Sequence, residues 1–72
     1  MRVLIIEDEP LAAARLEELI RGYDPGITIA GICDSVKESV NWFSSNTLPD
    51  LLFLDVQLGD GLSFEIFEQV QV

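Results

Sequence analysis

The chain has 72 residues, which allows one small domain and excludes a large multi-domain enzyme, because a chain this short buries only about 60 % of its unfolded surface. It carries 13 Asp and Glu against 4 Lys and Arg, a formal net charge of -9, which argues against direct nucleic-acid binding because neutralising phosphates requires basic residues. Hydrophobic residues make up 49% and charged residues 24%, as in a folded globular domain rather than a disordered acidic tail.

Three short apolar runs, at residues 3–6, 27–33 and 51–54, are predicted to be β-strands. The first, VLII, is unbroken and rich in β-branched residues, which is typical of a strand buried on both faces of a parallel sheet. It ends in the acidic sequence Glu7-Asp8-Glu9, and the third run ends in Asp55. The first and third strands are therefore both followed directly by carboxylates.

Helices are predicted between the strands and after the last one. Pro10 suits a first helical position and Gly22 a C-terminal stop, so the first helix is expected from Pro10 to about Arg21. Ser35 with Glu38 three residues later forms a capping-box pattern that opens a second helix, ending near residues 44–46. The segment 59–61 (GDG) predicts a flexible turn, and a last helix is expected from residue 64 to the C-terminus.

Several side chains are given structural roles by the same pattern. Trp42 and Phe43 are adjacent, so only one is expected to face the core, leaving Trp42 partly exposed. Phe64 and Phe67 are expected to pack against the sheet, and Ser63 to cap the last helix. Asp60, beside a glycine, is interpreted as a turn residue. The buried strand end at residue 33 indicates a small core cysteine rather than a reactive thiol.

The alternation of strands and helices predicts an α/β fold with a parallel, doubly wound sheet. Right-handed crossovers then bring the carboxyl ends of all strands to one edge, where such folds bind ligands. If the first and third strands are neighbours, Glu7, Asp8 and Asp55 emerge side by side at that edge. Like charges this close destabilise one another unless a proton or a cation compensates. An all-oxygen site open to solvent favours Mg²⁺, and the spacing of an EF-hand Ca²⁺ loop is absent.

Residue types absent from the sequence narrow the chemistry further. There is no histidine, so imidazole catalysis and His-based metal sites are excluded. The single cysteine, Cys33, cannot form an internal disulfide. No signal peptide precedes residues 1–3 and no apolar run reaches about 18 residues, so we expect a cytoplasmic protein without a membrane partner.

Two motifs, IIEDEP at residues 5–10 and LFLDVQLGDG at residues 52–61, resemble the leading motifs of bacterial response-regulator receiver domains. The sequences ARL at 14–16 and DGLSF at 60–64 are most similar to receivers attached to LytTR-type DNA-binding output domains. The resemblance implies a flavodoxin-like sheet, here truncated to three strands in the order 2-1-3. It spans the whole chain.

The resemblance also implies a role for each site residue. Asp55 would accept a phosphoryl group from a phosphohistidine on a sensor histidine kinase, and the chain would not be an enzyme in its own right. Asp8 and Asp55 would ligate Mg²⁺ directly, Glu7 would hold it through water, and the backbone carbonyl of Gln57 would add an oxygen. Phosphorylation would switch a downstream output domain, which is expected to bind DNA. Phosphoryl transfer depends on positioning and charge neutralisation, which agrees with this set of residues.

The sequence departs from the family pattern in its length. A complete receiver has five strand-helix units, with a hydroxyl residue after the fourth strand and a lysine after the fifth, and neither has a counterpart here. Lys37, the only lysine, lies in the second predicted helix. Residues 1–72 are therefore interpreted as the incomplete N-terminal part of a receiver domain, without an output domain. The third strand would be an open edge, and self-association through that edge is expected.

Two other functions remain open at this stage. A haloacid-dehalogenase-like phosphatase also uses an Asp after a buried strand, but needs a second Asp two residues later, where this chain has Gln57. A GTPase or kinase is disfavoured because no Gly-rich loop ends in Lys-Ser/Thr. The second alternative is an inert interaction fragment whose acids bind no metal, and a Mg²⁺ titration would distinguish it.

Overall fold

The computed structural model describes residues 1–70. Strand β1 (Arg2–Ile6) lies in the middle of a three-stranded sheet, between β2 (Thr28–Cys33) and β3 (Leu51–Leu54). Both pairings are parallel, and the order is β2-β1-β3. The predicted α/β fold class and strand order are confirmed.

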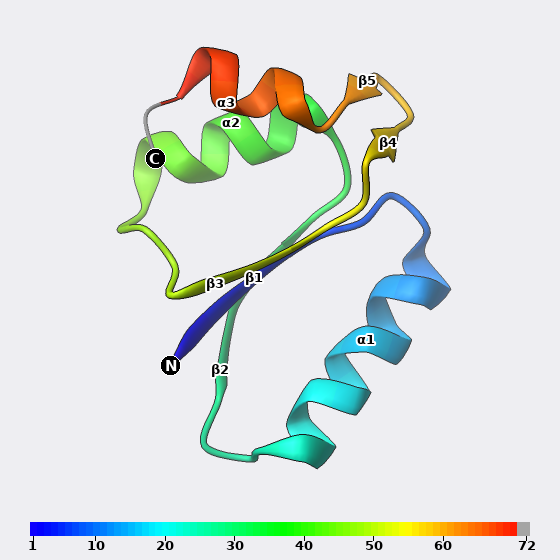
Figure 1. The fold of residues 1–72 in the computed structure, drawn as a ribbon, viewed down its shortest axis with the longest axis vertical. Helices are drawn as coiled ribbons and strands as arrows, with labels where there is room; N and C mark the ends of the chain where they lie inside the picture. Colours follow the sequence, from blue (N-terminus) through cyan, green and yellow to red (C-terminus); the bar gives the residue numbers. More distant parts are fainter. Residues whose placement is uncertain (71–72) are drawn as a thin grey trace.

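Helices cover both faces of the sheet. Helix α1 (Pro10–Tyr23) lies on one side, while α2 (Val36–Ser45) and α3 (Phe64–Gln69) lie together on the other (Figure 1). Between β3 and α3 the chain forms an antiparallel hairpin from β4 (Gln57–Leu58) and β5 (Gly61–Leu62). The segment predicted as a flexible turn is thus the tip of a paired hairpin. None of the helices in the described part of the chain is long and apolar enough to cross a membrane.

The core is built on both faces of β1. Val3 and Ile5 pack with Ile20 of α1, while Leu4 and Ile6 belong to a larger cluster that α2 and α3 complete. All four strand residues are at most 1% exposed. Successive strand side chains point to opposite faces, so an unbroken apolar run is what a strand buried on both sides requires.

Helix α1 extends beyond the predicted end at Arg21. Gly22 and Tyr23 remain helical, and the helix ends at Asp24, whose backbone is extended with φ -150° and ψ 102°. The residue before a proline is disfavoured in the helical region, and Pro25 follows Asp24. The proline, rather than the glycine, therefore sets the end of this helix.

Trp42 and Phe43 are both half-buried and pack against the core, so the prediction that only one faces it was wrong, whereas the partial exposure predicted for Trp42 is confirmed. Their rings meet edge-to-face with centroids 5.4 Å apart. Because α2 lies flat on the sheet, two residues about 100° apart around the helix can flank its line of contact. The Trp42 ring lies against Gly31 of β2, and the Arg2 guanidinium is 5.9 Å from its centroid.

Helix α3 begins at residue 64, as predicted, but differs from the prediction in the packing of Phe64 and in where it ends. Phe64 is 56% exposed, so it does not pack against the sheet, whereas Ile66 is fully buried and Phe67 packs against the larger core cluster. The helix ends at Gln69, and the last two residues of the predicted helix lie outside the described residues. A short helix over one sheet face can bury one side only, and here Ile66 occupies the centre of that side.

Gly31→Ala is expected to lower the free energy of unfolding by about 1–3 kcal/mol, because a Cβ there would lie 2.5 Å from Nε1 of the packed Trp42 ring. Gly22→Ala is the matched control: a Cβ there meets nothing within 4 Å, and Ala in a helix gains about 0.5–1 kcal/mol over Gly. Urea unfolding measures both. Equal urea midpoints for Gly31→Ala and the unchanged protein would contradict the close packing.

Candidate functional site

Backbone hydrogen bonds continue past the ends of the strands and place two of the carboxylates. The N–H of Glu7 donates to the carbonyl of Cys33 at 2.9 Å, and the N–H of Asp55 donates to the carbonyl of Ile6 at 2.9 Å. Glu7 and Asp55 thus leave the sheet at neighbouring positions of its carboxyl edge.

Cys33 lies at the same edge and is 1% exposed, as predicted for a core residue. This burial raises the pKa of its thiol to about 11.

Three acidic side chains meet at this edge. Glu7, Asp8 and Asp55 each contribute one carboxylate oxygen to a group whose atoms all lie within 4.8 Å of one another. Glu7 and Asp55 are partly buried and Asp8 is exposed, so the cluster is open to solvent on one side. The predicted meeting of these residues is confirmed as geometry.

The cluster raises the pKa of the Glu7 carboxyl above its ordinary value. Loss of solvation is the main cause, and the neighbouring Asp55 and Asp8 carboxyls add to it. The N–H of Glu9, which donates to Glu7 at 3.3 Å, acts in the opposite direction. Placing three acids together therefore has an electrostatic cost that a bound cation would offset.

The ligand chemistry of the cluster fits Mg²⁺. Its donor atoms are all carboxylate oxygens, which a hard divalent cation prefers, and no nitrogen or sulfur ligand belongs to the group. The exposed side leaves room for the waters that Mg²⁺ keeps in its coordination shell. The resemblance to receiver domains likewise implies Mg²⁺ at these acids.

The hairpin after Asp55 lies beside the acidic cluster. Gln57 lies in β4 opposite Leu62, and its N–H makes a long hydrogen bond of 3.4 Å to Oδ1 of Asp55. Ser63 does not cap α3 with its side chain, contrary to the prediction. It is buried, and its N–H and hydroxyl donate to the carbonyl of Val56 at 2.9 and 3.1 Å. These two hydrogen bonds to one carbonyl hold the base of the hairpin together.

Asp60, predicted only as a turn residue, also caps helix α2. Its Oδ1 accepts the N–H of Val36 at 2.8 Å and its Oδ2 accepts the N–H of Lys37 at 3.1 Å. These two hydrogen bonds lower the pKa of the Asp60 carboxyl. Ser35, as predicted, accepts the N–H of Glu38 at 3.0 Å. No local pattern signals the Asp60 contacts, because the partners lie 23 and 24 residues earlier in the chain.

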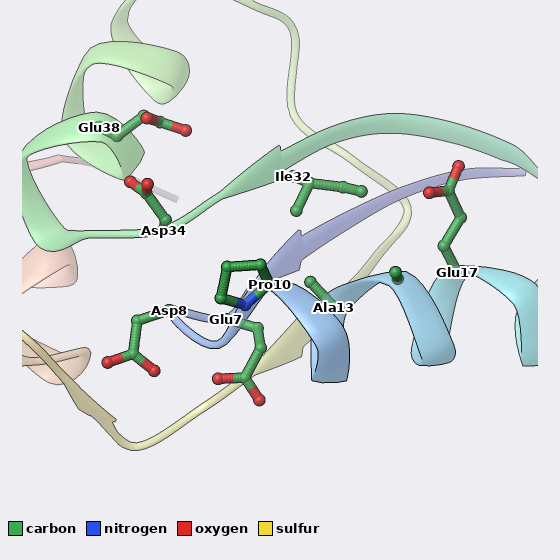
Figure 2. Close-up of a pocket in the computed structure, with 9 residues that line it drawn as sticks. Glu7, Asp8, Pro10, Ala13, Glu17, Ile32, Asp34 and Glu38 are labelled. Carbon is green, nitrogen blue, oxygen red and sulfur yellow. The ribbon is translucent and has the colours of Figure 1, made fainter.

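A pocket of about 290 Å³ lies beside the cluster, between α1 and the start of α2. Figure 2 shows Asp34 and Glu38 together on one side of it and Glu7 and Asp8 on the other. Burial and the neighbouring Asp34 raise the pKa of the Glu38 carboxyl. The negative charge therefore extends beyond the three clustered acids, which favours cations around the whole edge.

The chain matches the response regulator receiver domain family over residues 3–72. It belongs to this family. The conclusion agrees with the resemblance in the two acidic motifs and with the sheet order β2-β1-β3. Receiver domains are signalling domains rather than classical enzymes.

Named relatives are regulators of the same kind. The chain is 40% identical over 70 residues to the sensory transduction protein LytT of Enterococcus faecalis, covering 97% of this chain and 28% of that protein. It is 41% identical over 58 residues to the transcriptional regulatory protein BtsR of Salmonella typhi, covering 81% and 23% respectively. It is 43% identical over 61 residues to the phyllosphere-induced regulator PhyR of Methylorubrum extorquens, covering 85% and 22%.

The chain thus spans about a quarter of these relatives, 28%, 23% and 22% of their lengths. No solved structure matches it significantly. The family assignment therefore rests on the sequence match, and the site geometry agrees with it.

Asp55→Asn is expected to stabilise the metal-free chain at pH 7 by about 0.5–1 kcal/mol, because it removes one of three mutually repelling charges. A raised folded-state pKa of Glu7 favours folding below the ordinary Glu pKa and disfavours it as pH rises through the folded value. The advantage of the variant should therefore shrink as pH falls toward 4.5.

Urea unfolding in the presence of EDTA tests this expectation. Glu68→Gln is the control, because it removes one exposed carboxylate on α3 outside the cluster. If Asp55→Asn is no more stable than Glu68→Gln at pH 7, the clustered charges do not repel one another as the geometry indicates.

Proposed function

We propose that the chain is the phosphoacceptor part of a two-component phosphorelay, in which Asp55 receives a phosphoryl group from a sensor histidine kinase. The supporting observation is the group of three carboxylates within 4.8 Å, in a chain of the receiver family. Asp8 and Asp55 would hold Mg²⁺ directly, Glu7 through a water molecule and Gln57 through its backbone carbonyl. Residues 1–72 would form the N-terminal part of the receiver domain.

Asp55 acts as the nucleophile in this proposal. One of its carboxylate oxygens attacks the phosphorus of a phosphohistidine, the phosphorus–nitrogen bond breaks, and the electron pair stays on the imidazole nitrogen. The product is an aspartyl phosphate. The 2.9 Å hydrogen bond from the N–H of Asp55 to the carbonyl of Ile6 fixes the backbone of Asp55 at the sheet edge, which supports in-line positioning of its side chain. Bound Mg²⁺ would supply the positive charge that the transferring group and the acids need.

The other acids position rather than react. Asp8 is exposed and next to the cluster opening, which suits a direct ligand that also meets solvent. Glu7 is partly buried and its pKa is raised, so its negative charge is costly in the absence of a cation. An acid that contacts the ion through a water molecule would have its charge stabilised without crowding the ion.

The proposed partners follow from the family and from the charge. A histidine kinase donates the phosphoryl group, and an output domain, DNA-binding as in LytTR-type regulators, responds to it. The chain itself, with a net charge of -9, would not contact nucleic acid. We place it in the cytoplasm and away from membranes. Phosphorylation would shift the equilibrium between two conformations of a surface. The chain would not turn over a substrate as an enzyme does.

The open edge of β3 supports a second proposal, that the chain associates with itself through this strand. In the described residues β3 pairs with β1 only. Leu51 is 43% exposed, and a pocket of about 260 Å³ beside it is lined mainly by apolar side chains, including Leu48, Leu52 and Phe67. An exposed apolar edge strand is a template for pairing with another chain.

Incubation with Mg²⁺ and acetyl phosphate should add one phosphoryl group to the chain, measured by intact-mass spectrometry. Asp55→Asn should abolish the adduct, because an amide is not a nucleophile for this reaction. EDTA should also abolish it. Glu68→Gln, which lies outside the cluster, should keep it.

The outcomes separate the alternatives. A phosphoryl adduct that persists in Asp55→Asn would contradict the assigned acceptor. Mg²⁺-dependent amide shifts at Asp8 and Gln57 without any adduct would indicate a metal pocket that cannot complete the transfer. No shifts and no adduct would favour an inert interaction domain.

Leu51→Lys should reduce self-association, because a charged residue on an edge strand opposes strand pairing. Leu62→Lys is the control, since Leu62 is similarly exposed, 46% against 43%, but lies on the hairpin. Light scattering over a concentration series measures both. A stable monomer of the unchanged chain at high concentration would refute the proposal.

A further inference from the structure

The hairpin after Asp55 is fixed at its base and at its tip. The base is held by the two bonds from Ser63 to the carbonyl of Val56, and by Leu58, which is 4% exposed. The tip carries Asp60, whose carboxylate spans two backbone N–H groups of α2. The segment that bears the expected carbonyl ligand, Gln57, lies between these two anchors.

Asp60 uses both carboxylate oxygens on α2. The distances of 2.8 Å to Val36 and 3.1 Å to Lys37 make a two-point contact between the hairpin tip and the helix. Hydrogen bonds to a charged acceptor are stronger than neutral ones, and a negative charge is favoured at a helix N-terminus. Ser35 caps the next N–H, that of Glu38, independently of the hairpin.

The tip also lies next to a proposed metal ligand. A Cβ built on Gly59, the residue before Asp60, would lie 3.9 Å from Oδ2 of Asp8. The hairpin tip therefore borders Asp8 on one side and the start of α2 on the other. Any displacement of the tip from α2 would change the surroundings of Asp8 and the path of the strand that carries Gln57.

We propose that Asp60 is a positioning residue for the Mg²⁺ site, which holds the hairpin against α2 so that Gln57 and Asp8 keep their places around the ion. This inference rests on the proposed function. Asp60 itself contacts neither the metal nor the phosphoryl group. Because the tether links two elements, Mg²⁺ binding should in turn strengthen the cap on α2.

Four forms of the protein test the inference: unchanged, Asp60→Ala, Asp60→Asn and Ser35→Ala. Asp60→Ala removes the tether, while Asp60→Asn removes the same charge but keeps one acceptor oxygen. Ser35→Ala removes a cap of the same helix that has no link to the hairpin. Mg²⁺ alone is titrated and followed by backbone amide shifts, and amide hydrogen exchange of Gln57 and Leu62 is measured without metal.

Asp60→Ala should weaken Mg²⁺ binding about tenfold, the lower end for loss of a residue that supports metal ligands, and should speed exchange in the hairpin. Asp60→Asn keeps one acceptor oxygen but turns its NH2 group toward the other backbone N–H, so it should recover only part of both. Ser35→Ala should change neither more than about twofold. Equal weakening by Ser35→Ala would show that the effect is only loss of helix capping, and that result overturns the proposal.

Failure of the proposed function is a separate result. If the unchanged protein binds no Mg²⁺ and forms no aspartyl phosphate, the phosphorelay proposal fails, and Asp60 has no metal site to position. If the unchanged protein binds Mg²⁺ and forms the adduct, but Asp60→Ala does the same with unaltered affinity and unaltered hairpin exchange, only the positioning inference fails.

Discussion

The hydrogen bonds on both edges of β1 are the constraint on which the rest of the structure depends. They bring β2 and β3, which are distant in the sequence, into parallel alignment with a single buried strand. The same ladder continues to Glu7 and Asp55, whose N–H groups are bonded to Cys33 and Ile6. The position of the acidic cluster is therefore a direct extension of the sheet, and disturbing the register of β1 would separate the acids.

The acidic cluster destabilises the fold that positions it. Glu7, Asp8 and Asp55 lie close enough for their charges to repel, and loss of solvation together with these neighbouring carboxyls raises the pKa of Glu7. The buried apolar face of the sheet beneath them offsets this destabilisation, because β1 is almost completely removed from solvent. Functional sites in α/β folds commonly carry such local strain, which a ligand of opposite charge relieves.

The hairpin holds Gln57 in a defined position beside the acidic cluster. A loop free at its tip would leave Gln57 without a fixed relation to Asp55, but Ser63 closes the base and Asp60 holds the tip on α2. The start of α2 is thereby connected to the carboxyl edge through side chains rather than through the backbone. In a signalling domain such a connection would join the proposed phosphoacceptor, Asp55, to a helix that other surfaces can contact.

Local sequence patterns predicted the three strands and the α/β order, because apolar runs and parallel crossovers have few topological solutions. The strand order came from the resemblance to receiver domains, and with β1 next to β3 it predicts the meeting of Glu7, Asp8 and Asp55. Packing between the elements decided the rest. It left Trp42 and Phe43 both half-buried and Phe64 exposed, and it gave Ser63 and Asp60 the contacts that hold the base and the tip of the hairpin. These outcomes depend on which elements lie opposite one another, and a contact with α2 across 24 residues leaves no periodic trace in the sequence.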